Sequence, residues 1–185
     1  MADEWLDVLD NDHRVIGQAL RSEVHQRGWR HRGVDVFLFT REGKLLVQTR
    51  TATRATFPSA LDCSVAEHVR AGEDFWQAAV RGMKEEIGIE GIALEPLLDF
   101  SHSNSPTDHE TARLFRGSVD PARVRFDPEE VARVDYYTLA ELDALLSEGK
   151  TPFSHWFEQL LKWYLGKPHE LQILKIHEPA THKQE

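Results

Sequence analysis

Two adjacent glutamates, Glu85 and Glu86, stand at the end of a segment with helical periodicity. Asp74 has the side chain of an N-cap, and Gly88 is the residue type that commonly ends a helix. Apolar residues recur between them at the three- and four-residue spacing of one helix face, namely Phe75, Ala78, Ala79, Met83 and Ile87. The pattern predicts an amphipathic helix that carries both glutamates near its C-terminal end.

Two neighbouring carboxylates in this position repel each other and oppose the helix dipole. A divalent cation would neutralise them, and hard oxygen ligands suit Mg²⁺ or Mn²⁺. Arg81 lies four residues before Glu85, so the two side chains share a stripe of the helix and can pair. The alternative for the acidic pair is a solvated charged face without a ligand.

The stretch from residue 66 to residue 89 resembles the Nudix box, the signature of a family of hydrolases. The matching positions are Glu73, Arg81, Met83, Glu85, Glu86, Gly88 and Ile89. Two positions differ from the pattern, because its opening glycine is Glu67 here and its glutamate after the arginine is Gly82. A glycine inside a helix costs roughly 1 kcal/mol relative to alanine. Gly82 therefore indicates close packing or room for a ligand, and Gly82→Glu should raise metal affinity if the rest of the site is intact.

The resemblance implies an α/β fold, the α/β/α sandwich of the Nudix family with a mixed β-sheet. It implies a hydrolase that acts on acid anhydrides, with Mg²⁺ or Mn²⁺ held by Glu85, Glu86 and Glu67, and with Arg81 orienting Glu85. The expected substrate is a nucleoside diphosphate linked to another group. Because Gly82 removes one acid of the box, we expect Glu110 to be the general base, with Glu67 as the second candidate.

The chain most resembles the branch that includes isopentenyl diphosphate isomerases, through its N-terminal hairpin, Phe57-Pro58 and the spacing of histidines and late acids. That likeness implies a metal-binding set comparable to His31, His68, Asp108 and Glu110, with His25 a looser match. The catalytic cysteine of the isomerases is replaced by Ala66, and the single cysteine, Cys63, lies three residues earlier. We therefore place isomerisation below hydrolysis. A non-catalytic module that binds a nucleotide or a protein remains the other alternative.

The remaining elements are predicted from apolar runs and turn residues. Strands are expected at 5–10, 15–20, 34–39, 45–50, 61–65, 92–102, 111–119 and 131–137, and helices at 138–147 and 154–165. The pair 34–39 and 45–50 is expected at the centre of the sheet, residues 103–110 as a loop, and Glu67 and His68 in a loop after the strand at 61–65. Arg50, Arg54 and His68 are candidates for binding the substrate.

Composition favours one domain over residues 1–185, with an N-terminal extension at 1–30, the box at 66–89 and a loosely held tail at 167–185. Hydrophobic residues make up 41% of the chain, enough for a sizeable core. The net charge of −9 argues against binding to a nucleic acid duplex or an anionic membrane. The resemblance implies a small-molecule diphosphate as the partner. One cysteine and the lack of a long apolar run favour the cytoplasm. The aromatic stripe of the last helix is expected in the core, with a homodimer contact as the alternative.

Overall fold

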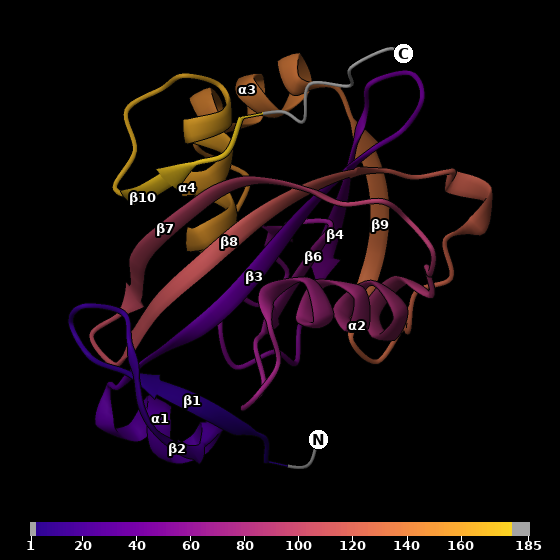
Figure 1. The fold of residues 1–185 in the computed structure, drawn as a ribbon. Coiled ribbons are helices and arrows are strands. Elements are labelled where there is room, and N and C mark those ends of the chain that lie inside the picture. The colour runs from indigo at the N-terminus through magenta and orange to yellow at the C-terminus, as the bar shows by residue number, and fades with distance from the viewer. Residues whose placement is uncertain (1–2, 179–185) are drawn as a thin grey trace, which may run out of the picture.

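The computed structural model describes residues 3–178 and consists of a twisted mixed sheet with helices on both faces (Figure 1). The strands are β1 (Trp5–Leu9), β2 (Val15–Leu20), β3 (Arg30–Phe39), β4 (Leu45–Arg50), β5 (Leu61–Asp62), β6 (Val65–His68), β7 (Glu95–Ser105), β8 (Asp108–Ser118), β9 (Val131–Tyr137) and β10 (Gln172–Ile176). The helices are α1 (Arg21–Arg27), α2 (Phe75–Ile87), α3 (Leu139–Glu148) and α4 (His155–Tyr164), with a short 3-10 turn, η1 (Pro121–Arg123). Within this part of the chain, no helix is both long and apolar enough to cross a membrane.

Strand β3 is the hub of the sheet. Along one edge it runs parallel to β8 from Arg30 to Phe39. Its other edge is shared, because β6 pairs antiparallel with residues 33–36 and β4 reaches only Phe39. The prediction that β3 and β4 pair along their length at the centre of the sheet is therefore wrong, because they pair only at Phe39 and Leu45. Since β6 already occupies that edge, β4 instead pairs with β9 over six residues.

Two hydrophobic cores lie on opposite faces of the sheet (Figure 1). Helix α2 covers one face, where Val34, Val36 and Leu38 of β3 are buried. Helices α3 and α4 cover the other face, where Phe37 packs against Phe157. The aromatic stripe of α4 thus lies in the core, as predicted. Because side chains alternate along a strand, neighbouring residues of β3 and β6 face different layers.

The helix boundaries follow the capping residues read from the sequence. The Asp74 side chain accepts a hydrogen bond from the backbone N–H of Gln77 at 2.8 Å, and the Gln77 side chain accepts one from the backbone N–H of Asp74. Helix α2 ends at Gly88, whose φ is 65°. Thr138 and Glu141 form the same type of capping box at the start of α3.

Three sequence expectations are corrected by strand pairing. Residues 103–110 are not a loop, because β7 and β8 form a hairpin that continues to Ser105 and Asp108. Glu67 and His68 also lie on a strand, since β6 pairs with β3. The tail contains β10, which pairs antiparallel with β7 as an exposed edge strand. Residues 179–185 of the predicted tail lie outside the described part of the chain.

Candidate functional site

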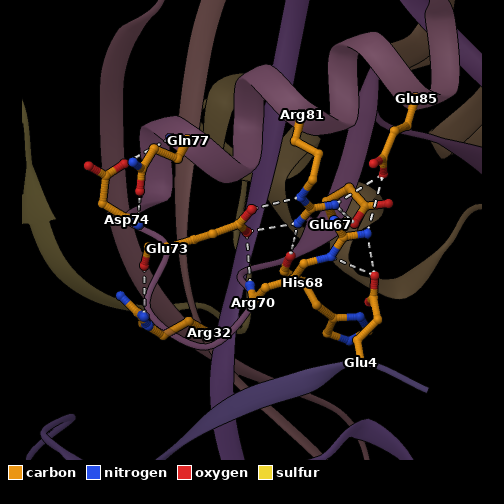
Figure 2. Close-up of polar contacts among 10 residues, drawn as sticks. All are labelled: Glu4, Arg32, Glu67, His68, Arg70, Glu73, Asp74, Gln77, Arg81 and Glu85. Carbon is orange, nitrogen blue, oxygen red and sulfur yellow. Dashed lines mark hydrogen bonds and ion pairs between the residues drawn. The ribbon is translucent and has the colours of Figure 1, made fainter. Parts of the chain in front are cut away.

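Arg81 is the centre of a network that joins α2 to β6 and to the loop before the helix (Figure 2). Its Nε and Nη2 donate to the two carboxylate oxygens of Glu73 at 2.9 and 3.0 Å, and Nη2 also donates to the carbonyl of His68 at 2.8 Å. Its Nη1 donates to Glu67 at 2.9 Å and to Glu85 at 3.2 Å. Burial lowers the pKa of Arg81, but the bonds to Glu73 and Glu67 outweigh burial and raise the pKa above its ordinary value. The predicted Arg81–Glu85 pair is confirmed.

Gly82 is required by close packing between α2 and β6. A Cβ atom at this position would lie 2.7 Å from Val65 Cγ1 and 2.8 Å from Glu67 Cγ. Real Cβ atoms essentially never make such short contacts, and neither Cγ atom is the free end of a long side chain. Gly82→Glu alone therefore meets a clash rather than an open position, which corrects the expectation of a simple gain in metal affinity.

The two adjacent glutamates of α2 have different environments. Glu85 lies at the surface and contacts Arg81 and Arg70. Glu86 is only 6% exposed and accepts a hydrogen bond at Oε2 from the Gln48 amide at 2.6 Å. Within the described chain, Glu86 Oε1 has no hydrogen-bond partner, and burial raises the pKa of this carboxyl well above its ordinary range. An unpartnered buried carboxylate oxygen beside other carboxylates fits a hard cation.

A second cluster of ligand-type side chains lies across the sheet from Arg81. His25, His31 and His68 have ring nitrogens within 4.8 Å of one another, and His31 has the same relation to Asp108 and Glu110. These residues come from four elements, α1, β3, β6 and β8. Three imidazoles and two carboxylates form a donor set typical of a transition metal rather than of Mg²⁺ alone.

The orientation of His31 favours ligand binding in this cluster. Its Nδ1 contacts the carbonyl of Trp29 at 3.1 Å, so that Nε2 faces Asp108 at 3.7 Å. Within residues 3–178, the buried Nε2 atoms of His25 and His31 have no hydrogen-bond partner. Burial lowers the pKa values of His25 and His68, which keeps both rings in the neutral form that binds metals.

Glu110 occupies a slot left by a glycine of β3. A Cβ atom on Gly33 would overlap Glu110 Oε2. Asn104 donates to Glu110 Oε1 at 3.2 Å, and His102 Nε2 lies 3.8 Å from Oε2. Burial tends to raise the pKa of Glu110, but His102, His31 and His68 outweigh burial and hold the pKa below its ordinary value.

The candidate residues from the sequence therefore fall into two groups. Glu67, Arg81, Glu85 and Glu86 gather at α2, whereas His68 and Glu110 belong to the histidine cluster on the other face. Strand β6 supplies both groups, because Glu67 pairs in register with Val34 and His68 with Gly33. The structure thus separates Glu110 from Arg81 by the thickness of the sheet.

The two arginines predicted to bind substrate make contacts within the protein. Arg50 donates to Asp62 at 2.7 Å, and its guanidinium lies 5.1 Å from the ring centre of Trp156. Arg54 lies 3.9 Å from Glu130. Substrate binding by these arginines stays a prediction.

Sequence reasoning missed Gln48, His102 and Asn104 as partners of the candidate acids. Gln48 interrupts the apolar run of β4, and a polar residue within such a run indicates a buried polar contact. His102 and Asn104 carried no such signal, since their roles depend on the β7–β8 register.

The sequence and fold resemble those of known proteins. The family model described as NUDIX domain matches residues 29–157. The chain is 39% identical over 152 residues to the "Uncharacterized Nudix hydrolase SCO1686" of Streptomyces coelicolor, a match that covers 80% of this chain and 81% of that protein. It is 29% identical over 163 residues to the Isopentenyl-diphosphate Delta-isomerase 2 of Photorhabdus laumondii, covering 86% and 91%. The crystal structure of DR0079 from Deinococcus radiodurans matches with a TM-score of 0.73 and 26% identity, covering 86% and 98%.

Proposed function

Because the chain belongs to the NUDIX family and is a hydrolase of acid anhydrides, we propose that it is a metal-dependent pyrophosphohydrolase cleaving a nucleoside diphosphate linked to another group. The observation that carries this proposal is that Arg81 Nη1 joins Glu67 to Glu85, while the buried Oε1 of Glu86, the next residue of α2, has no partner among residues 3–178. A helix whose role is only structural has no need of this arrangement.

Glu67, Glu85 and Glu86 would hold Mg²⁺ or Mn²⁺. A metal bound there supplies charge neutralisation for the diphosphate oxygens and a water of lowered pKa. Arg81 fixes Glu67 and Glu85 through a single nitrogen, Nη1, and so sets the spacing of these two carboxylates. Gln48 donates to one oxygen of Glu86, and the other oxygen has no hydrogen-bond partner in the described part of the chain.

Two carboxylates are candidates for the general base that activates water. Glu110 is the first candidate, and its lowered pKa keeps it ionised at neutral pH. Glu67 is the second, and it lies beside the proposed metal ligands rather than across the sheet. Replacing each acid singly with glutamine tests them, because a variant with unchanged turnover rules out that residue as the base.

The histidine cluster favours a second metal, as the likeness to isomerases implies. His25, His31, His68, Asp108 and Glu110 would hold it. Isomerisation itself has less support, since Ala66 stands where the isomerases have cysteine. The Cys63 thiol is buried and donates to Asp35 at 3.5 Å, and burial raises its pKa, which disfavours the reactive thiolate.

The test is phosphate release, coupled to a phosphatase, from nucleoside di- and triphosphates, dinucleotide cofactors and diphosphate sugars with Mg²⁺ or Mn²⁺. Wild type is compared with Glu86→Gln and with a control, Glu90→Gln, whose exposed side chain contacts Lys84 outside the cluster. We expect metal-dependent turnover that falls about 100-fold in Glu86→Gln and is retained in Glu90→Gln, since mutating even an outer-shell partner of a metal site costs about 10–100-fold. Absence of turnover together with nucleotide binding would instead support the non-catalytic binding module.

A further inference from the structure

The two departures from the Nudix box, at positions 67 and 82, are in contact with each other. The box pattern has glycine at the first position and glutamate at the second, and this chain has the reverse. A Cβ atom on Gly82 would lie 2.8 Å from Cγ and 3.4 Å from Cβ of Glu67. The volume next to Gly82 is thus already filled by the Glu67 side chain.

We propose that Glu67 replaces the missing helix carboxylate, so that one ligand of the metal has moved from α2 to the facing strand β6. The exchange keeps a single carboxylate in the space between the two elements. This inference rests on the proposed metal-dependent function. It treats Glu67 and Gly82 as one paired change, in which Glu67 supplies the carboxylate and Gly82 leaves room for it.

The direction of the Glu67 side chain supports this assignment. Its Oε2 accepts from Arg81 Nη1 at 2.9 Å, and the same nitrogen donates to Glu85 at 3.2 Å (Figure 2). Arg81 also binds both oxygens of Glu73, so its positive charge is shared among three carboxylates. Glu67 and Glu85 therefore share one guanidinium nitrogen, and two carboxylates held side by side in this way are the kind of oxygen ligands that a divalent cation prefers.

A purely structural role as a partner of Arg81 is the competing explanation for Glu67. Glu73 provides the comparison, because it binds Arg81 at least as extensively and lies at the start of α2, before the helix itself. If Glu67 only anchors Arg81, Glu67→Gln and Glu73→Gln should affect metal binding alike. If Glu67 is a ligand, Glu67→Gln should weaken metal binding much more.

The experiment measures Mg²⁺ binding by titration calorimetry, without substrate, in wild type, Glu67→Gln and Glu73→Gln. Mg²⁺ is the probe because the histidine nitrogens across the sheet disfavour it relative to transition metals. Glu73→Gln keeps a side-chain oxygen that can accept from Arg81. We therefore expect Glu67→Gln to raise the Kd at least tenfold more than Glu73→Gln does. Equal Kd changes in the two variants would overturn the proposal.

A reciprocal exchange provides a second, independent test. Gly82→Glu alone should lower Tm and weaken Mg²⁺ binding, because its Cβ meets Val65 and Glu67. Glu67→Gly alone should remove the ligand. The double variant Glu67→Gly/Gly82→Glu should bind Mg²⁺ at least tenfold more tightly than either single variant and regain Tm relative to Gly82→Glu. A double variant whose Kd and Tm equal the sum of the two single effects would overturn the exchange. Because the readout is Mg²⁺ affinity, failure of hydrolysis on any substrate leaves this test intact.

Discussion

Replacing Asp35 with asparagine should make the stability of the protein less sensitive to alkaline pH. Asp35 lies on β3, is 4% exposed and accepts a hydrogen bond from the Cys63 thiol at 3.5 Å. Burial raises the pKa of Asp35 to about 8, and the charges of Glu110 and Asp62 raise it while His102 opposes them. The folded protein therefore keeps a proton on this carboxyl that the unfolded chain has released.

The magnitude follows from the distance between the two pKa values. The folded pKa of about 8 lies about four above the ordinary value of 3.8, and each pKa unit corresponds to about 1.4 kcal/mol. Between pH 4 and 8 the folded state binds more protons than the unfolded state, so the free energy of unfolding falls as pH rises, by up to about 6 kcal/mol from this group. Asparagine removes this dependence, and its buried amide costs about 1–3 kcal/mol at every pH.

The assay is urea unfolding between pH 5 and pH 9 with EDTA present. We expect Asp35→Asn to gain stability relative to wild type as the pH rises from 5 to 9, and to be the more stable protein at pH 9. The control is Asp99→Asn, because Arg113 holds the pKa of Asp99 below its ordinary value despite burial. That carboxylate contributes stability above pH 4, and the control should lose stability at both pH values. Parallel curves for wild type and Asp35→Asn would refute the reasoning.

Three further substitutions test other parts of the structure. Gly33→Ala should destabilise the fold by about 1–3 kcal/mol in urea unfolding, because the added Cβ would overlap Glu110. The double variant Gly33→Ala/Glu110→Ala should recover part of this loss. A single variant as stable as wild type would show that the Glu110 side chain does not need the space beside Gly33. His31→Ala should abolish most of the rise in Tm that Zn²⁺ produces in wild type. Each protein is compared with its own EDTA-treated form. A rise in Tm as large as that of wild type would exclude His31 as a ligand. Trp156→Phe should cost about 1–3 kcal/mol in urea unfolding because its indole donates to Asp62 at 2.6 Å, and a loss below about 0.5 kcal/mol would show that this bond is not stabilising.

The sequence predicted the helices well because their signals are local. Asp74, Gly88 and Thr138 act on backbone groups within one turn, so their roles are independent of the rest of the fold. Most strands were also located, and the NUDIX fold expected from the box is confirmed by the family match. Strand β10 was missed because an exposed edge strand shows no alternation of buried and exposed residues.

The sequence predicted which residues belong to the candidate site better than it predicted how they are arranged in space. Arg81, Glu85 and Glu86 were found because helix geometry fixes their spacing. The position of Glu110 depends on the pairing of β7 with β8 and of β8 with β3, which single-sequence patterns do not specify. The contact between Glu67 and Gly82 likewise depends on how β6 packs against α2.

Strand β6 has a consequence for tolerance to insertions and deletions. Glu67 and His68 are consecutive in the chain, yet their side chains serve clusters on opposite faces of the sheet. A shift of β6 by one residue against β3 would send the carboxylate to the histidines and an imidazole to α2. One added or lost residue between Val65 and Glu67 would thus exchange the ligands of both clusters at once, whereas conservative substitutions at Glu67 or His68 would alter one cluster and leave the other intact.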